Sequence, residues 1–544
     1  MIHIKQLSSL EKVTLDYNLE REEFSRMSVL LNEEFAYQIA YVNDELAPKE
    51  KLKVTVNSPL KGFITLKTVE NIPSEFPVYF DIDDDDYISK EPGLFPDLLK
   101  PFKTGFIEVT GKIVHAIWVN VKLDGSIPAG IYPIEIVFEN ENCEFKKIFN
   151  IEITDASLPE QEMLFTQWFH ADCIAEAYNV KVFSKKHWEL IGKFMKTAAE
   201  NGINTILTPI FTPPLDTEIG GERLTVQLVD VEKTKDGYKF GFERFAKWID
   251  IAKENGITHF EICHLFTQWG AKAAPKIIAR VNGRNKRIFG WDTVATGEEY
   301  KEFLSSFLPA LTKEIKRLKI EKNTLFHISD EPDGEEHMKN YLAAKAIVAP
   351  YLKEFKIIDA LSQLDFYKSG AVENPVPVTA TVEEFVKAGA NNLWTYYCCT
   401  TKKGLCNRYL SMPSYRNRAI GLQLWKYDIK GFLHWGYNFY HSVFSREIIN
   451  PFLVTDGKCA YPSGDAFSVY PGDDGPWESI RLKVFCHALQ DMRALRLLED
   501  KLGKEKATYI IEEILGEKIT FKDYPHSAEK LLEIREKVNY KVRS

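Results

Sequence analysis

Two adjacent carboxylates, Asp330 and Glu331, follow an apolar-rich segment and stand directly before Pro332. The segment 324–330 has the composition of a β-strand, and a proline cannot donate to a sheet, so the strand should end here. Neighbouring like charges raise each other's pKa, and an acid that keeps its proton near neutral pH can act as a general acid. The pair is therefore a candidate for acid–base chemistry on an uncharged bond such as a glycosidic bond. The same charges would also suit the start of a helix over 335–348.

Alternation along the strand decides which side chains reach the candidate site. Side chains of a strand point alternately to its two faces, so His327, Ser329 and Glu331 should share one face. Glu331 should then project into the site. Asp330 can join it only if the chain bends at the end of the strand, a bend that Pro332 would assist.

The elements that must position this pair follow two patterns. Residues 1–157 contain short alternating segments separated by turns, which is typical of a β-sandwich. From residue 158 strands and helices alternate, which predicts parallel βα units. Eight strands are predicted, at 164–170, 203–211, 258–266, 324–330, 355–360, 376–380, 392–398 and 431–437.

Eight such units are typical of a TIM-type (β/α)8 barrel. The predicted fold class is therefore α/β, with a β-sandwich at 1–157, a catalytic barrel at 158–505 and a charged helical tail at 506–544. Chemistry in such barrels lies at the carboxyl ends of the strands. Aromatic, histidine and polar residues gather at the predicted strand ends, in a long loop at 271–295 after the third strand and in a last helix at about 480–502. We take these as candidate sugar-binding residues: His170, Asp172, Trp291, Trp394, Tyr396, Tyr397, Trp435, Asn438 and Arg481.

Two carboxylates adjacent in sequence favour one assignment of catalytic roles. Glycosidases with two catalytic carboxylates place them on opposite sides of the bond, whereas neighbours in sequence, with Cα atoms about 3.8 Å apart, usually act from one side. A substrate-assisted reaction fits this arrangement. Glu331 would protonate the leaving oxygen, and Asp330 would hold the 2-acetamido group of an N-acetylhexosamine while its carbonyl attacks.

The other candidates receive roles from the same geometry. Trp394 and Trp435 are candidate platforms for a sugar ring, whose C–H face stacks on aromatic side chains. Tyr396 or Tyr397 would bind the acetamide oxygen. Hydroxyl groups of the sugar would be bound by the remaining polar candidates, namely Asn438, His170, Asp172 and Arg481.

Composition excludes several classes of function. The chain of 544 residues has a formal net charge of −9 and no long basic run, which argues against nucleic-acid and anionic-membrane partners. We find no zinc spacing, P-loop or dinucleotide motif, and therefore expect no metal and no cofactor. The eight cysteines are scattered and the N-terminus lacks an apolar signal segment, so we expect a cytoplasmic protein with free thiols.

Several segments resemble glycoside hydrolase family 123. Besides the Asp-Glu-Pro run after a strand at 324–330, the similar segments are Gly93-Leu94-Phe95-Pro96-Asp97-Leu98-Leu99, His434-Trp435-Gly436-Tyr437, Tyr470-Pro471-Gly472 and Ser479-Ile480-Arg481-Leu482. The resemblance covers nearly the whole chain. It implies a retaining β-N-acetylgalactosaminidase with Asp330 and Glu331 as its catalytic pair. One departure is Lys483, where the family usually has an acidic residue.

Three hypotheses stay open at this point. The first is a glycosidase that releases a terminal β-linked N-acetylgalactosamine. The second keeps the barrel and the carboxylates but acts on another sugar. The third is a carbohydrate-binding protein without catalysis, because a fold does not imply a function. In each of them the partner is a carbohydrate, and nothing in the sequence specifies an oligomeric state.

Overall fold

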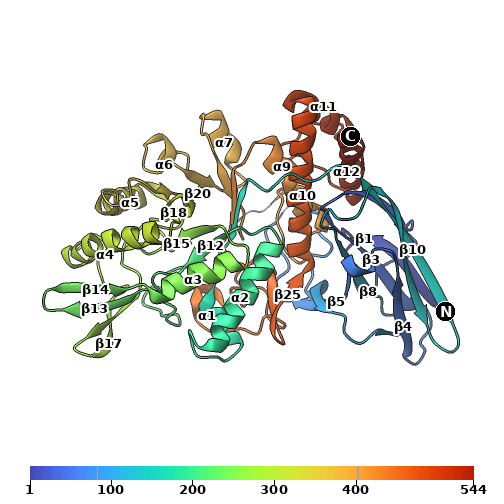
Figure 1. Ribbon diagram of the computed structural model, residues 1–544, viewed down its shortest axis with the longest axis horizontal. Helices are drawn as coiled ribbons and strands as arrows, with labels where there is room; N and C mark the ends of the chain where they lie inside the picture. Colours follow the sequence, from blue (N-terminus) through green and yellow to red (C-terminus); the bar gives the residue numbers. More distant parts are fainter. Residues whose placement is uncertain (83, 401–402, 544) are drawn as a thin grey trace.

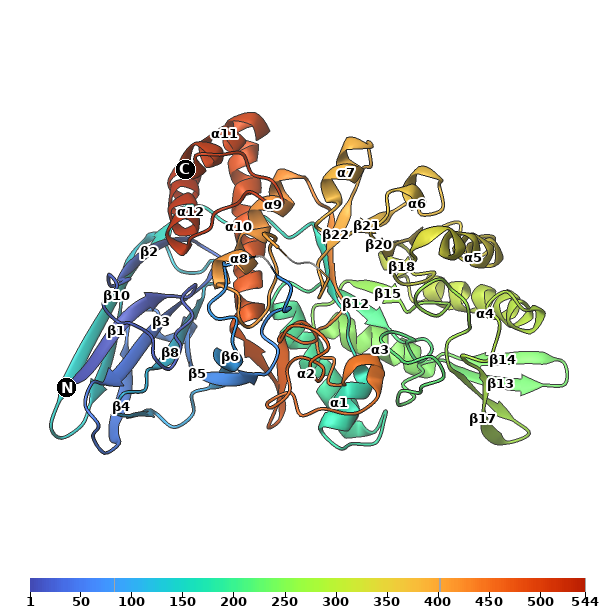
Figure 2. The same ribbon diagram turned by 180° about the vertical axis from the view of Figure 1, so that it is seen from behind.

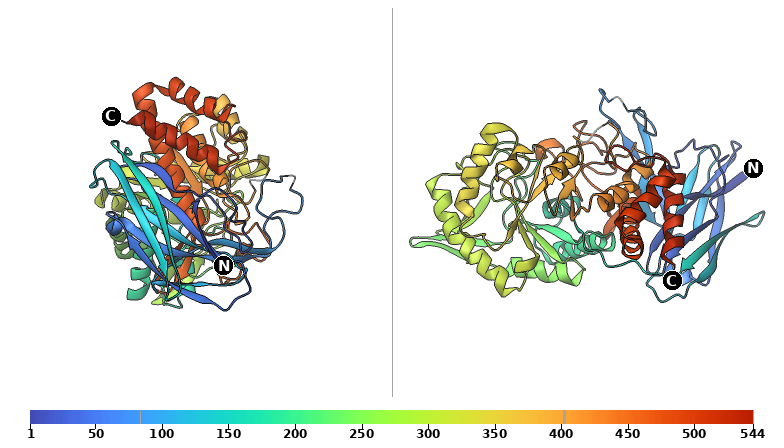
Figure 3. Two further views of the ribbon diagram at one scale, coloured as in Figure 1. Left: turned by 90° about the vertical axis from the view of Figure 1, so that its right-hand side faces the viewer. Right: turned by 90° about the horizontal axis from the view of Figure 1, so that it is seen from above.

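The computed structural model describes residues 1–82, 84–400 and 403–543. Two β-sheets lie at one end of an elongated molecule, and parallel strands surrounded by helices lie at the other (Figure 1). The long helix α10 (Ile480–Leu502) runs between the two ends, as the view from above also shows (Figure 3). Both termini lie at the end that carries the two sheets.

The first of these sheets has seven antiparallel strands. Their order is β1 (Ile2–Ser8), β3 (Glu34–Asn43), β8 (His115–Lys122), β5 (Ile64–Ser74), β6 (Gly93–Pro101), β25 (Gly475–Ser479) and β24 (Val469–Gly472). The last two strands come from late in the chain, far outside the region 1–157. The chain therefore returns to its first sheet immediately before α10 begins.

The second sheet has five strands, in the order β2 (Arg26–Leu30), β10 (Glu144–Thr154), β9 (Gly130–Glu139), β4 (Glu50–Asn57) and β7 (Phe106–Val109). Only β2 and β10 pair in parallel. Alternate apolar side chains of the two sheets share one hydrophobic cluster, in which Ile39 and Val119 of the first sheet join Leu52 and Ile136 of the second. The alternation in the sequence thus places one face of each sheet against the other.

The remaining region is built on parallel strands. Seven of them form a sheet in the order β19 (Lys356–Ile357), β18 (Thr324–Phe326), β15 (His259–Ile262), β12 (Thr205–Thr208), β11 (Leu164–Gln167), β23 (Gly431–His434) and β22 (Trp394–Tyr396). β20 (Asp359–Leu361) and β21 (Pro375–Pro377) pair separately, and one parallel bridge joins Val378 to Tyr396. Each of the eight predicted ranges overlaps a parallel strand, although the strands are shorter than predicted.

Helices cover the outside of these strands (Figures 1 and 2). They are α1 (Ala171–Ala177), α2 (Lys185–Glu200), α3 (Glu243–Glu254), α4 (Glu298–Arg317), α5 (Gly334–Val348), α6 (Asp365–Lys368), α7 (Val382–Lys387), α8 (Ser414–Arg418) and α9 (Ile420–Lys426). The helices α11 (Lys504–Leu515) and α12 (Ala528–Val542) follow α10. α12 packs beside β2, where the Asn539 amide donates to the Ser28 carbonyl at 3.0 Å.

A small sheet is inserted beside the parallel strands. It contains β14 (Gly237–Gly241), β13 (Asp230–Thr234), β16 (Ile277–Val281) and β17 (Arg284–Phe289). The long segment 271–295, expected to be a loop, supplies the hairpin of β16 and β17. Among the described residues, no helix is long and apolar enough to cross a membrane, and no disulfide is formed.

Candidate active site

A cavity of about 140 Å³ opens where the parallel strands end, and it contains both carboxylates. Its lining comes from segments that follow different strands of the parallel sheets. The lining residues include Trp168, Asp216, Gln268, Trp269, Asp330, Glu331, Tyr396, Cys398, Cys399, Trp435 and Tyr461. Since parallel strands bring their carboxyl ends to one edge, residues far apart in the sequence meet here.

The chain bends sharply to bring both carboxylates into this cavity. β18 ends at Phe326, and Glu331 has a φ of 41°, a left-handed value that a residue of its size rarely adopts. Such a conformation costs about 1–3 kcal/mol and is concentrated at functional sites. The bend turns Asp330 toward the same cavity as Glu331, instead of the opposite face that strict alternation would give it.

A buried ionic network supports the strand beneath the pair. The imidazole of His327 donates to Glu261 (Nε2 to Oε1, 2.5 Å) and faces Asp359 (Nδ1 to Oδ1, 3.3 Å). These two carboxylates raise the pKa of His327 to about 10, against the opposing effect of burial. Asp359 also accepts from the Tyr341 hydroxyl at 2.5 Å and from the Ile328 amide at 3.0 Å. A protonated His327 therefore anchors the segment that leads to the two carboxylates.

The electrostatics of the cavity keep a proton on the pair. Burial and the neighbouring Glu331 charge raise the pKa of Asp330 well above its usual value. Burial also raises the pKa of Glu331, while a hydrogen bond from the Tyr396 hydroxyl to Glu331 Oε1 opposes that rise. Two coupled carboxyl groups of this kind titrate as a pair and retain one proton above the ordinary carboxyl range.

Trp435 forms one wall of the cavity, and hydrogen bonds to neighbouring residues hold it in place. Its indole Nε1 donates to Asp465 Oδ2 at 2.7 Å. Its carbonyl accepts from His170 Nε2 at 3.0 Å, and the guanidinium of Arg223 donates to His170 Nδ1 at 3.0 Å. Burial and Arg223 lower the pKa of His170 to about 3, so its ring is neutral and carries its proton on Nε2. Hydrogen bonds from Arg223 to His170, and from His170 to Trp435, thus fix this wall of the cavity.

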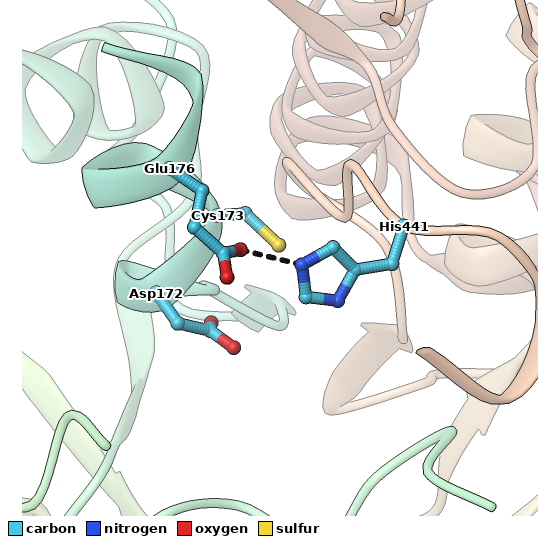
Figure 4. A group of neighbouring side chains, drawn as sticks. All are labelled: Asp172, Cys173, Glu176 and His441. Atoms are coloured by element: carbon cyan, nitrogen blue, oxygen red, sulfur yellow. Dashed lines mark hydrogen bonds and ion pairs between the residues drawn. The ribbon is translucent and has the colours of Figure 1, made fainter. Parts of the chain in front are cut away.

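Figure 4 shows a second polar cluster beside this chain. Arg223 binds Asp172 through two bonds of 2.7 and 2.8 Å, and His441 Nε2 lies 2.5 Å from Glu176 Oε2. The Cys173 thiol lies next to them. The donor types would suit a metal ion, but two cations already balance the two carboxylates. We therefore interpret the cluster as an ionic tie between α1 and the loop after β23.

A second group with metal-binding side chains lies under the cavity. His264 and His327 stack at 4.3 Å between ring centroids, with 19° between their planes, and Asp359 lies beside them. The lone pair of an imidazole nitrogen lies in the plane of its ring, so two parallel rings do not aim at one ion. The stack instead packs against Trp168, whose ring lies at 77° to that of His264 and which lines the cavity.

The cavity brings together four of the predicted residues: Asp330, Glu331, Tyr396 and Trp435. The other seven do not line it. Trp394 is buried against Gly431, and the Tyr397 hydroxyl donates to Asn417. Asn438 and His170 bond to each other, Asp172 is bound to Arg223, and Arg481 is bound to Asp97. Trp291 lies in a small separate pocket.

Arg481 joins the two ends of the molecule. Its guanidinium binds the buried carboxylate of Asp97 through two bonds of 2.9 Å, and the Tyr470 hydroxyl donates to the same carboxylate at 2.6 Å. These three residues belong to three of the segments on which the family resemblance rested. Lys483, the departure from that pattern, is buried between Glu34 and Glu478, at 2.5 and 2.9 Å. These motif residues therefore hold β6, β24 and α10 together.

Replacing Arg481 by Met should destabilise the protein by about 3–5 kcal/mol, because it leaves the Asp97 charge buried without its partner. Urea denaturation measures this change in the free energy of unfolding, with Arg284→Met on the exposed β17 as control. The double variant with Asp97→Leu should recover part of the loss. A loss below about 1 kcal/mol would contradict the interpretation.

Asp216 and Trp269 line the cavity but were not among the predicted site residues. Asp216 follows β12, its carboxylate accepts from the Phe444 amide at 3.2 Å, and burial raises its pKa to about 6. Trp269 follows β15, is 37% exposed and packs edge-on against Phe444. Both stand just beyond predicted strand ends, so the rule that located Asp330 would have found them. Asp465, which holds Trp435, carries no such signal in the sequence.

A wider groove of about 660 Å³ lies over the inserted sheet. Its acidic residues are Asp230 and Glu232, and Asp230 forms an ion pair with Arg244 on α3. The groove lacks a pair of adjacent carboxylates and the strand ends of the parallel sheet. The smaller cavity is therefore the candidate active site.

Comparisons with known proteins agree with this assignment. The family model "Glycoside hydrolase 123, catalytic domain" matches residues 168–498, more than half of the chain. A family 123 glycoside hydrolase from Clostridium perfringens, whose structure is described in terms of glycolipid glycan hydrolysis, is 14% identical with a TM-score of 0.73. The match covers 100% of this chain and 98% of that one.

More distant structures include beta-glucuronidase 3 from Bacteroides uniformis, at 11% identity and a TM-score of 0.32, covering 89% of this chain and 51% of that one. The endo-beta-1,4-mannanase from Thermotoga petrophila is 12% identical, with a TM-score of 0.36 and coverage of 61% and 77%. No curated protein matches the sequence. On the strength of the family match over its catalytic region, the chain belongs to glycoside hydrolase family 123 and is a glycosidase.

Proposed function

We propose that this glycosidase releases a terminal β-linked N-acetylgalactosamine with retention, by a substrate-assisted reaction. The observation that carries the proposal is that two carboxylates adjacent in sequence, Asp330 and Glu331, line the same small cavity. The sugar comes from a glycolipid, a glycoprotein or a free oligosaccharide, and the Clostridium perfringens relative favours the first of these sources.

The two carboxylates differ in their partners, and this sets their roles. Tyr396 fixes Glu331 through a hydrogen bond. Among the described residues, no side chain or amide donates to the Asp330 carboxylate, so it is available to a donor on the substrate. The N–H of the acetamide is such a donor. Its approach stabilises the Asp330 anion and leaves the shared proton of the pair on Glu331.

The reaction then proceeds in two steps. Glu331 gives its proton to the glycosidic oxygen as the bond to the anomeric carbon breaks, and the acetamide oxygen forms a new bond to that carbon. Asp330 stabilises the positive charge of the resulting oxazolinium ring. In the second step Glu331 takes a proton from water, which attacks the anomeric carbon and opens the ring with net retention.

Aromatic residues supply the platform for the sugar. Trp435 is held by Asp465 and His170, so its ring is fixed before substrate arrives. Trp269 faces the same cavity with more than a third of its surface exposed. A rigid ring loses little conformational freedom when a sugar stacks on it. We therefore assign Trp435 to the sugar that is released and Trp269 to the adjoining part of the substrate.

Asp216 supports a second candidate function. It is a third carboxylate in the cavity, and a glycosidase acting on a sugar without an acetamide would need a carboxylate nucleophile across the bond from Glu331. The main proposal gives Asp216 a different part, as acceptor of a hydrogen bond from a sugar hydroxyl.

The variant Asp216→Asn separates the two roles. As a hydroxyl ligand, Asp216 should contribute a charge-assisted hydrogen bond, so kcat/KM should fall about 10- to 100-fold, mainly through KM. Exposed Asp230→Asn on the inserted sheet serves as control. Steady-state kinetics decide the matter, since a fall in kcat beyond about 10⁴-fold would instead identify Asp216 as the nucleophile.

Tyr396→Phe should move the alkaline limb of the pH profile upward. The Tyr396 hydroxyl donates to Glu331 and lowers the pKa of that carboxyl, so its removal raises the pKa further. Glu331 must be protonated to act as the acid, and the limb of kcat/KM should therefore shift by about one pH unit to higher pH. A pH profile of wild type and variant checks the direction, and a downward shift would contradict it.

We propose that the eight parallel units close as a (β/α)8 barrel over 158–505, preceded by a β-sandwich at 1–157 to which β24 and β25 add an edge. A helical region over 506–544 follows, whose last residue lies outside the described ones. The single parallel bridge from Val378 to Tyr396 supports closure between β21 and β22. The shared hydrophobic cluster of the two N-terminal sheets supports the sandwich.

The first experiment compares aryl glycosides. Purified protein is assayed on 4-nitrophenyl β-N-acetylgalactosaminide, β-N-acetylglucosaminide and β-galactoside. The proposal predicts turnover of the first substrate, at least tenfold slower turnover of the second and none of the third. Hydrolysis of the β-galactoside at a similar rate would favour the second candidate function, because that sugar has no acetamide.

A further inference from the structure

Two consecutive cysteines lie on the wall of the candidate active site, at the end of β22. Cys398 is buried and Cys399 is half-buried, and both line the cavity that holds Asp330 and Glu331. The mechanism proposed above uses neither thiol. A pair of thiols beside catalytic carboxylates offers chemistry that the carboxylates do not.

The two thiols are neighbours in space as well as in sequence. Both side chains line the same cavity, and they interact electrostatically with each other. Cys398 Sγ lies 3.1 Å from Thr400 Oγ1. The adjacent Cys399, and after it burial, raise the pKa of Cys398 well above its usual value, so this side chain is present as a thiol at neutral pH.

The geometry of adjacent residues limits what the pair can form. Consecutive Cα atoms are about 3.8 Å apart, whereas a relaxed disulfide needs about 4.4 Å or more. A direct S–S bond would therefore be strained. An atom of a soft, thiophilic element that bonds to both sulfurs closes a larger ring and avoids this strain. Thiols bind such elements best.

We propose that Cys398 and Cys399 form a dithiol site for trivalent organoarsenic compounds, and that its occupation blocks the active site. An arsonous acid, R–As(OH)2, condenses with both thiols. Two As–S bonds form, and each hydroxyl leaves as water with one thiol proton. Arsenic stays trivalent throughout, so no oxidant is needed. The bound R group then occupies the cavity of about 140 Å³ beside Glu331.

The test uses phenylarsine oxide, which hydrates to an arsonous acid, with the full-length protein kept reduced by a phosphine. Intact-mass measurement should show one phenylarsenic adduct per chain, and hydrolysis should fall at least tenfold. 2,3-Dimercaptopropanol should reverse both effects, whereas the same concentration of a monothiol should not. The fall in hydrolysis rests on the proposed function, but the adduct does not, so mass alone decides binding if no substrate is turned over.

Cys399→Ser is the matched variant and should lose the adduct. Cys398→Ser is the second variant, in case the first does not fold, and should lose it as well. Cys459→Ser, at an exposed thiol, is the control and should keep both the adduct and its reversal. Absence of an adduct on the wild type, or an equal adduct on both cavity variants, would overturn the site. An adduct without loss of hydrolysis in an active enzyme would overturn the blocking.

Discussion

Replacing Glu331 by Gln should lower kcat/KM for a β-N-acetylgalactosaminide by about 10²- to 10⁴-fold, the usual contribution of a general acid. The amide fills nearly the same volume and can still accept the hydrogen bond from Tyr396, so the fold should be unchanged. Glu335→Gln, on the exposed side of α5 four residues later, is the matched control and should keep wild-type kinetics. Steady-state assays measure both.

The leaving group makes this prediction specific. A phenol that leaves easily needs little protonation, so the loss in Glu331→Gln should be small for a 2,4-dinitrophenyl glycoside and large for a phenyl glycoside. A loss of equal size for both leaving groups would mean that Glu331 is not the acid.

Asp330→Asn should cause a loss of similar size, about 10²- to 10³-fold, for a different reason. Asp330 is proposed to orient the acetamide and to stabilise the charge of the oxazolinium ring, which forms whichever leaving group departs. The loss should therefore be nearly the same for all leaving groups. Asp333→Asn, at an exposed carboxylate on the same turn, is the matched control. A strong dependence on the leaving group would exchange the roles of Asp330 and Glu331.

The same variant should gain stability at neutral pH. Burial and the Glu331 charge raise the pKa of Asp330 in the folded protein, so its carboxyl binds a proton more tightly folded than unfolded. Wild-type stability should therefore fall as the pH rises above the ordinary carboxyl range near 4. The amide in Asp330→Asn removes this cost. Urea denaturation at pH 7 should show a more stable variant, and the difference should shrink toward pH 4.

Local patterns in the sequence were enough to place Asp330 and Glu331 just beyond the end of a strand. Alternation and Pro332 marked the end of a strand, and the parallel βα order placed that end at a common edge. What the sequence did not specify was the bend that brings Asp330 round, since it depends on a left-handed Glu331 that its surroundings must hold in place. Asp330 was expected to join Glu331 only if the chain bent here, and the structure contains this bend, with both carboxylates lining the cavity.

Partners distant in the sequence explain most of the residues that do not reach the cavity. Arg481 stands where a sugar ligand was expected, but its partner Asp97 lies 384 residues earlier and was not foreseeable from local sequence. His170 was expected to bind hydroxyls and instead holds the carbonyl of Trp435. A polar residue at a strand end thus signals an important position, while its contacts decide whether it faces substrate or supports a residue that does.

One glycine of the motif at 434–437 has a clear structural reason. A Cβ on Gly436 would stand 2.3 Å from the carbonyl oxygen of Ala466, so the backbone beside Trp435 packs too closely for any side chain. The segment that contains Ala466 also carries Asp465, which binds the Trp435 indole. The motif is therefore explained by the wall of the cavity, which the sequence alone did not show.

The most direct test of the proposed mechanism varies the acetamide itself. Aryl β-galactosaminides carrying N-acetyl, N-fluoroacetyl, N-difluoroacetyl and N-trifluoroacetyl groups present a carbonyl oxygen of decreasing nucleophilicity, at nearly constant size. If that oxygen attacks the anomeric carbon, kcat/KM should fall steeply along the series, by at least tenfold overall. A flat series would contradict substrate assistance and would transfer the nucleophilic role to a carboxylate of the protein.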